Sequence, residues 1–140
     1  MKKILIAIML VTGVSTFGFK NGEPISAEKQ VKLTVNLSFE NIVEGYDHLT
    51  KTEVYIDGTL CGTSTIRNES VPNTVICTTS KGTHMVKVIN YAYVDEVWEE
   101  HTIENQYSID CKYESSMNLK KKNNKLNLIF DIDSGTRKKK

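Results

Sequence analysis

The sequence lacks the features that mark several large classes of protein. It has only two prolines and three cysteines in 140 residues, and its 18 Lys and Arg nearly balance its 17 Asp and Glu. Because the chain has almost no excess charge, its overall composition gives no reason to expect binding to nucleic acid or to a membrane surface. The cysteines and histidines show no Cys-x-x-Cys or His-x-x-x-His spacing, so no zinc site is predicted. No long apolar stretch follows a 3.6-residue period, so helices are not expected.

The N-terminal apolar run is too short to cross a membrane. Two lysines precede an apolar segment of about 11 residues, Ile4 to Val14, whereas a membrane-spanning helix takes roughly 20. A basic start, an apolar centre and small residues up to Gly18 are typical of a cleavable export signal. We therefore predict a signal peptide over residues 1–18, with cleavage after Ala27 as the alternative. The mature chain would be secreted or periplasmic, with no membrane span.

The remainder has the size of one domain. Loss of Lys2 and Lys3 with the signal leaves 16 basic residues against 17 acidic ones, in a chain of about 122 residues. We expect residues 28–133 to form a single folded domain. Residues 134–140 (SGTRKKK) are basic and contain nothing to bury, so we expect a disordered tail there.

Seven or eight segments have the pattern of β-strands. In the clearest, Val31 to Phe39, apolar residues alternate with polar ones, as expected of a strand with one buried face. Asp57-Gly58 and Ser80-Lys81-Gly82 are turn signals between such segments. The predicted strands cover residues 31–39, 53–57, 59–65, 74–79, 83–93, 97–103, 107–113 and 126–132. Short strands at this spacing predict an all-β protein, a small antiparallel β-sandwich.

The three cysteines allow one disulfide and one spare thiol in an oxidising compartment. We predict a Cys61–Cys77 bridge, because these residues fall in neighbouring predicted strands, where Cβ atoms come within disulfide range. A Cys77–Cys111 bridge and three reduced thiols remain open as alternatives. A Cys–His dyad built on Cys111 would need a histidine beside it, and nothing in the sequence places one there.

One part of the chain carries a recognisable pair of motifs. VYIDGTLCGTS (Val54 to Ser64) is a strand that ends in Asp57-Gly58 and continues to a second glycine, Gly62. GTHMVKV (Gly82 to Val88) then has the form Gly-x-His-x-Val-x-Val. Over residues 54–93 the chain thereby resembles the PEGA-type domain, a small β-sandwich of bacterial envelope proteins, although the usual Thr-Pro after the second glycine is absent. A broader immunoglobulin-like sandwich would also accommodate these motifs.

An aromatic cluster is the main candidate for a binding surface. Tyr91, Tyr93 and Trp98 lie around the turn near Asp95, among acidic residues. If these rings are exposed, they can stack on sugar faces or anchor a protein partner. If they are buried, they belong to the core, where a tryptophan is often the central residue of a sandwich.

No set of residues predicts catalysis, a cofactor or a metal. The resemblance to PEGA-type domains implies a binding or structural module without a defined ligand. We therefore expect a secreted or envelope-associated module that is not an enzyme and that contacts a glycan or a protein. The alternative is a small secreted inhibitor or immunity-type protein acting on a hydrolase. Its inhibitory segment would be the polar loop Arg67 to Asn73, made rigid by the Cys61–Cys77 bridge.

Overall fold

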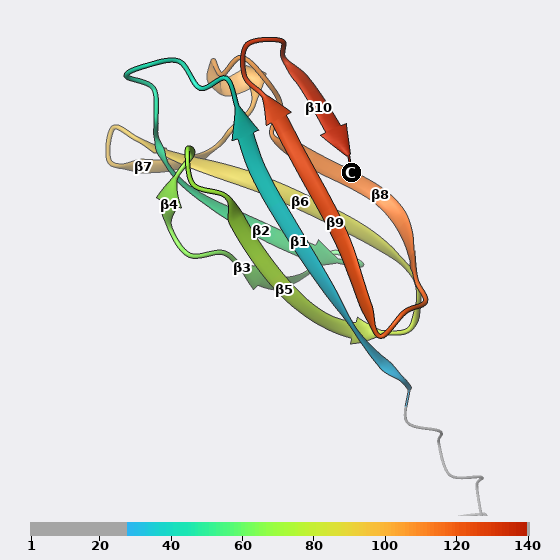
Figure 1. Cartoon of the computed structure of the whole chain (residues 1–140). Coiled ribbons are helices and arrows are strands. Elements are labelled where there is room, and N and C mark those ends of the chain that lie inside the picture. The colour runs from blue at the N-terminus through green and yellow to red at the C-terminus, as the bar shows by residue number, and fades with distance from the viewer. Residues whose placement is uncertain (1–27, 140) are drawn as a thin grey trace, which may run out of the picture.

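The computed structural model describes residues 28–139, so the predicted signal peptide lies outside the described residues. Ten strands and one short 3-10 helix follow one another here (Figure 1). They are β1 (Gln30–Glu40), β2 (Leu49–Ile56), β3 (Thr59–Thr63), β4 (Arg67–Asn68), β5 (Asn73–Ser80), β6 (Gly82–Val94), β7 (Val97–Glu100), η1 (Ile103–Asn105), β8 (Lys112–Leu119), β9 (Asn123–Asp131) and β10 (Thr136–Lys139). This confirms the predicted all-β sandwich. No helix of the described part is long and apolar enough to span a membrane.

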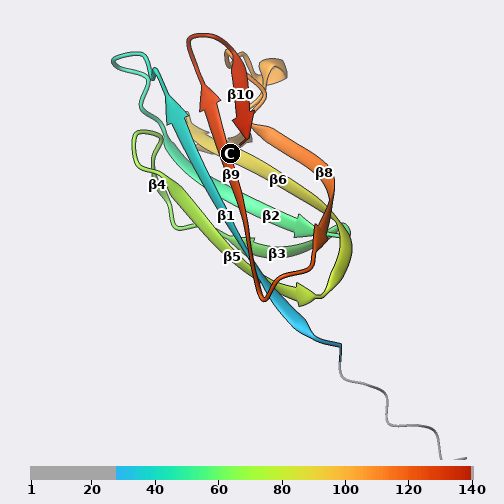
Figure 2. The same cartoon turned by 45° about the vertical axis from the view of Figure 1, so that its right-hand side comes forward.

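The strands form two sheets packed face to face, and Figures 1 and 2 show the four-stranded sheet in front of the other. Its strand order is β10-β9-β1-β5. The six-stranded sheet has the order β3-β2-β6-β7, with β4 added to β2 and β8 added to β6. Neighbouring strands are antiparallel except β1 and β9, which run parallel. The first strand therefore lies in the middle of its sheet, between β5 and the late strand β9.

Side chains from both sheets fill the space between them. The alternation in β1 buries four apolar residues, and β9 buries three apolar residues beside them. The residues of these two strands that form the core are Val31, Leu33, Val35, Leu37, Leu126, Leu128 and Phe130. Across from them, β2 and β6 contribute Val54, Val86 and Val88, each fully buried. Burying an aliphatic or aromatic side chain of this kind stabilises the fold by about 1.5–3 kcal/mol, so this cluster is the main source of stability.

The two ends of the sandwich differ. At one end, which we call the hairpin end, the chain turns tightly at residues 57–58, 81 and 120–122. At the other, which we call the loop end, five connections meet, and four of them are longer than these turns. These connections cover residues 41–48, 64–72, 95–96, 101–111 and 132–135. Because the antiparallel strands of both sheets terminate together, segments far apart in sequence lie side by side at the loop end.

Two segments depart from the predicted pattern. Residues 107–113 alternate like a strand, but 107–111 belong to a loop, and the strand β8 begins only at Lys112. Ile109 and Cys111 are buried there because the loop covers the end of the core, which produces the same alternation without strand pairing. The predicted disordered tail is also wrong for Thr136–Lys139, which forms β10 on the edge of β9. Its side chains are all exposed, but besides the backbone pairing Lys138 pairs with Glu40 and Lys139 donates to the Tyr113 hydroxyl.

Candidate functional site

The predicted aromatic patch exists, on the outer face of the six-stranded sheet. Tyr93 and Trp98 are opposite one another on β6 and β7, with ring centroids 5.0 Å apart. Tyr91 and Trp98 are half-buried, Tyr93 is 37% exposed, and none of the three belongs to the core cluster. The Nζ atom of Lys51 lies 5.2 Å from the Tyr91 ring centre and 5.1 Å from that of Trp98. Since the protein's own lysine already covers these rings, the patch offers little free ring face to a sugar.

The hydroxyl groups of this patch are tied to an acidic neighbour. The Tyr55 hydroxyl donates a hydrogen bond of 2.6 Å to Glu53, and Lys51 pairs with the same carboxylate at 3.4 Å. Burial, reinforced by the charge of Glu53, raises the pKa of Tyr91. Tyr55 and Tyr91 therefore stay neutral, and the Tyr55 hydroxyl and Lys51 both find their partner in Glu53.

The cysteines are close together but not bridged. Cys61 on β3 and Cys77 on β5 face each other where the two sheets meet, and all three thiols, including Cys111, are free in the structure. Burial and a hydrogen bond with Cys61 raise the pKa of Cys77 to about 12. The predicted Cys61–Cys77 disulfide is not formed, and stays a prediction for the oxidised protein.

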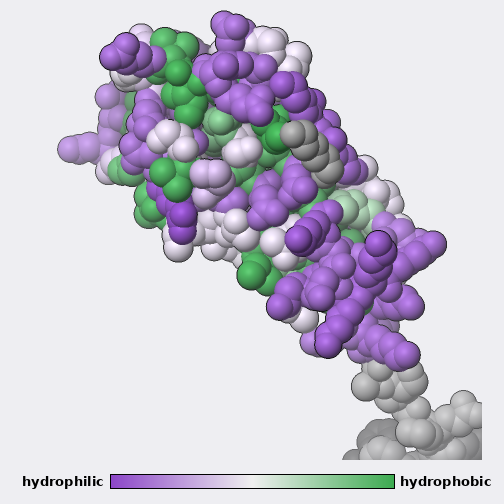
Figure 3. Space-filling model, in the orientation of Figure 1, coloured by the Kyte–Doolittle hydropathy of each residue, from purple (hydrophilic) through white to green (hydrophobic). Residues whose placement is uncertain are grey.

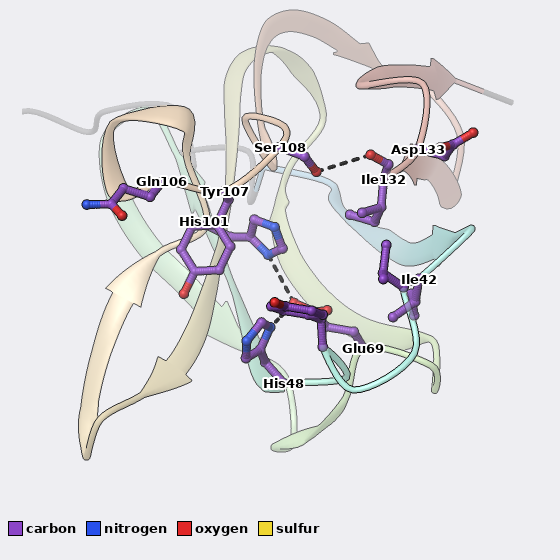
Figure 4. Close-up of a pocket in the computed structure, with 11 residues that line it drawn as sticks. Ile42, His48, Glu69, His101, Gln106, Tyr107, Ser108, Ile132 and Asp133 are labelled. Carbon is purple, nitrogen blue, oxygen red and sulfur yellow. Dashed lines mark hydrogen bonds and ion pairs between the residues drawn. The ribbon is translucent and has the colours of Figure 1, made fainter.

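A pocket of about 300 Å³ opens at the loop end (Figure 4). Four of the five connections contribute to its lining, which consists of Ile42, Val43, Tyr46, His48, Glu69, His101, Gln106, Tyr107, Ser108, Ile132 and Asp133. One part of the wall is aliphatic and another is aromatic, while the polar groups converge on Glu69. Such a concave site with a few convergent polar groups is typical of a ligand pocket.

Glu69 lies between two imidazoles. Its Oε1 atom is 3.1 Å from Nδ1 of His101 and 3.6 Å from Nδ1 of His48. Glu69 and His101 are each 3% exposed. None of these three facing atoms has a partner in proper hydrogen-bond geometry. A buried carboxylate of this kind is costly unless another group pairs with it, so the arrangement is prepared for an additional partner.

Local hydrogen bonds fix the segment that carries Glu69. Its backbone N–H donates to the carbonyl of His48. The Asp47 carboxylate accepts from the backbone N–H and hydroxyl of Ser70 and from the amide of Asn68. These bonds lower the pKa of Asp47, with the Ser70 hydroxyl as the largest cause. Two connections that are about 20 residues apart are thereby clamped together.

Two aromatic rings pack against His101. Phe39 stacks on it with ring centroids 5.5 Å apart, and Tyr107 lies 4.1 Å away. The chain brings Tyr107 back over the imidazole through the short helix η1 and through Gln106, which has a positive φ of 69°. The Tyr107 hydroxyl donates to Glu99 at 2.9 Å, and burial together with this carboxylate raises the pKa of Tyr107. The ring orientation of His101 is therefore set by packing.

Buried polar groups concentrate beneath this pocket. Of the ten buried polar residues between positions 28 and 139, nine lie in the loop-end half of the sandwich, and His84 lies at the hairpin end. The nine are Thr50, Thr52, Ser64, Glu69, Asn73, Asn90, His101, Thr102 and Asp131. In the described residues, every buried side-chain atom without a hydrogen-bond partner also lies here, on His48, Glu69, Asn73, Asn90 and His101. Natural proteins break the rule of satisfied burial mainly at functional sites, so this end is the best candidate.

The same residues do not form a metal centre or a thiol nucleophile. Among residues 28–139, no three His, Cys, Asp or Glu side chains are grouped so that they could hold a metal ion. Cys111 lies near Glu69, but burial, followed by the charge of Glu69, raises its pKa, so the sulfur stays a thiol. A Cys–His dyad needs a thiolate, and the geometry does not supply one.

A second histidine cluster, at the hairpin end, contains a serine, a histidine and an aspartate. His84 Nδ1 lies 2.7 Å from Asp57, and its Nε2 lies 2.9 Å from the Ser80 carbonyl and 3.4 Å from the Ser80 hydroxyl. Carboxylate and carbonyl oxygens only accept, so this geometry fits an imidazolium at His84, in which both ring nitrogens donate. Its pKa is raised, mainly by Asp57. A charged ring cannot take a proton from Ser80, so this cluster is a structural link between two turns.

The sequence did not identify His48, Glu69 and His101 as a set. In sequence they lie in a polar stretch, in a loop and after a strand, each with an ordinary interpretation. Their burial arises only when the loops meet. One weak sequence signal of a site at this end is that the segments connecting the strongly apolar strands are rich in polar residues and turn signals.

Comparison with known proteins adds no relative, because no protein-family model, curated protein or solved structure matches this chain. The two sheets define its class as a small β-sandwich. The resemblance to PEGA-type or immunoglobulin-like domains stays a prediction from the sequence.

Proposed function

We propose that this chain is an exported binding module, without chemistry of its own, that holds its ligand in the loop-end pocket. The observation that carries this proposal is the buried carboxylate of Glu69 in a preformed pocket, where its Oε1 atom has no hydrogen-bond partner. Its supports, Asp47, Phe39 and Tyr107, fix the loops in one arrangement. A preorganised site of this kind binds without the entropy cost of ordering loops.

The cellular setting and the family are part of the same proposal. The basic and apolar pattern of residues 1–18 supports export to the periplasm or outside the cell. The PEGA-like motifs support association with the cell envelope, where glycans and proteins are the available partners. The mature chain would act as a recognition or structural element of that envelope.

A pocket-filling variant tests this proposal. Val43 lines the pocket and is 54% exposed, so Val43→Trp fills the mouth without disturbing the core. Ile76→Trp is the matched control, because Ile76 is 58% exposed on β5, away from the pocket. We expect a ligand detected on a glycan array or in a quantitative pull-down from envelope material to be lost with Val43→Trp and kept with Ile76→Trp. Equal retention by both variants, or no ligand for the wild type in either assay, would reject the proposal.

The second candidate function, inhibition of a hydrolase, has one observation in its favour. The segment from Arg67 to Pro72 is exposed apart from Glu69, and Asp47 holds it rigid. A rigid exposed loop is what an inhibitor inserts into its target. A panel of lysozyme-like hydrolases and proteases assayed with the purified protein tests this function, and uniform lack of inhibition would reject it.

A further inference from the structure

The loop end is strongly acidic although the chain as a whole is nearly neutral. Its five connections contain eight acidic residues and one cationic residue, Arg67, besides the histidines. The acidic residues are Glu44, Asp47, Glu69, Asp95, Glu96, Glu104, Asp110 and Asp133. A recessed site lined by charge of one sign attracts ligands of the opposite sign and raises their rate of association.

A second hollow continues the pocket along this acidic end. It has a volume of about 430 Å³ and shares Tyr46, His48, Gln106 and Tyr107 with the pocket. Its other lining residues are Val94, Asp95, Glu99, Glu104 and Asn105. We call these two adjoining hollows the groove; Glu69 and Asp133 line one half, and three carboxylates line the other. Within the described part of the chain, no lysine or arginine lines either half.

The groove holds no lysine or arginine beside its most buried carboxylate, which faces only the imidazoles of His48 and His101. Glu69 is 3% exposed, and its Oε1 atom has no hydrogen-bond partner. An ammonium or guanidinium group would supply a permanent positive charge and a well-directed donor. This observation is independent of the acidic surroundings, because it concerns a single buried side chain whose Oε1 atom faces two imidazoles without a properly formed hydrogen bond.

The walls suit the rest of a long cationic side chain. Ile42, Val43 and Ile132 give an aliphatic surface on which a methylene stem can pack. Tyr46 is 64% exposed and offers a ring to a cation at the mouth. One face of Tyr107 is already stacked on His101, so this ring is a poor platform for a sugar. These features favour a basic side chain over a neutral glycan.

From this combination we infer that the groove binds a basic segment of a partner protein, with a lysine or arginine side chain against Glu69. A second basic residue of the same segment lies against Asp95, Glu99 and Glu104. This inference rests on the proposed function, since it names the ligand class of the same site. The hydrogen-bonded pair at Glu69 supplies most of the affinity, whereas the exposed half mainly sets the association rate.

A labelled tetralysine peptide tests the inference against purified protein by fluorescence anisotropy. We expect the wild type to bind the peptide, and the same peptide with acetylated lysines to show no binding. Glu69→Gln should weaken binding at least about 30-fold, the effect of removing one member of a buried charge pair. Asp95→Asn combined with Glu104→Gln should weaken it about threefold, with a smaller dependence on salt. Glu114→Gln, an exposed residue on β8, should leave it unchanged.

Further binding experiments show whether the basic-segment inference alone is wrong or whether the pocket does not bind a ligand at all. Suppose that the acetylated peptide or a chito-oligosaccharide binds as tightly as the tetralysine peptide and shifts the amide NMR signals of His101 and Tyr107. This result would overturn the assignment to a basic segment, but the pocket would still be a binding site. Free spermidine that binds as tightly as the peptide would overturn the assignment to a protein segment. Unchanged peptide binding in Glu69→Gln, with a native amide spectrum, would also overturn it. A second substitution, Glu69→Asp, keeps the charge, and we expect it to retain more affinity than Glu69→Gln.

Discussion

At the scale of single residues, His84 joins two turns that are 23 residues or more apart in sequence. It is nearly buried and donates to Asp57 of the β2–β3 turn and to the Ser80 carbonyl of the β5–β6 turn. The hydrogen bond from His84 lowers the pKa of Asp57, while Asp57 raises that of His84. Each group is therefore more easily charged in the folded protein than in the unfolded chain.

This pair predicts a defined pH dependence of stability. Because the pKa of His84 is raised on folding, its contribution is complete below its ordinary value of 6.5 and is lost as pH rises through the raised value. Because the pKa of Asp57 is lowered, its contribution is present above 3.8 and is lost as pH falls through the lowered value. We expect His84→Gln to lower the melting temperature most near pH 5–6 and less at pH 9. A difference that is constant from pH 5 to 9 would contradict this.

Cys61 and Cys77 give a second prediction at this scale. With oxidised glutathione as the oxidant, the two thiols should lose their hydrogens and form a disulfide, while Cys111, 0% exposed, stays reduced. In the chain-entropy model the loop so closed stabilises the fold by about 3 kcal/mol. Alkylation under denaturing, non-reducing conditions should then label one cysteine, against three after reduction. Cys61→Ser is the control and should label both remaining cysteines, and three labels on the oxidised wild type would exclude the bridge.

At the scale of elements, β3 and β5 approach closely where the two sheets meet. A Cβ atom added at Gly62 on β3 would lie 2.8 Å from Cγ1 of Val75, a buried residue of β5. Real Cβ atoms do not come this close, so one strand must shift to admit a side chain. The glycine is thus required by the spacing of the sheets, and the second glycine of the PEGA-like motif has a packing role here.

This contact can be tested by a compensating pair. We expect Gly62→Ala to lower the free energy of unfolding by about 1–3 kcal/mol, the range for overpacking a core. Val75→Ala alone should also be destabilising, because it leaves a cavity. If the clash with Val75 causes the loss of stability in Gly62→Ala, the double variant should be more stable than the sum of the two single effects predicts. A double-mutant cycle measured by urea unfolding would show this difference. Additive effects would refute the contact.

The strands differ in how far their sequences determined them. β1, β5 and β6 were predicted to within a residue or two, because strict alternation reports one buried and one exposed face. Apolar and polar residues also alternate over residues 107–113, but there the alternation arises from a loop that packs over the end of the core. β10 carries no apolar residue, so pattern reasoning had nothing to detect. The pocket was missed because the burial of Glu69 depends on four connections meeting, which no local pattern encodes.

At the scale of the whole molecule, charge is separated along the long axis. Opposite the acidic loop end, the hairpin end presents Lys29, Lys81 and the lysines of residues 120–122. In Figure 3 this end is mainly hydrophilic, whereas hydrophobic residues reach the surface nearer the loop end. A near-zero net charge therefore conceals a dipolar molecule, which would orient in the field of a charged partner before contact.

The position of β1 has a consequence for biosynthesis. Its two neighbours are β5 and β9, and the parallel pairing with β9 runs from residue 123 to residue 131. A ribosome delivers β1 first and β9 among the last strands, so one edge of β1 has no native partner for most of translation. Such distant pairing is slow because a long loop must close first. The domain therefore cannot complete its core until nearly the whole chain has been made, which keeps it open during any passage through a narrow pore.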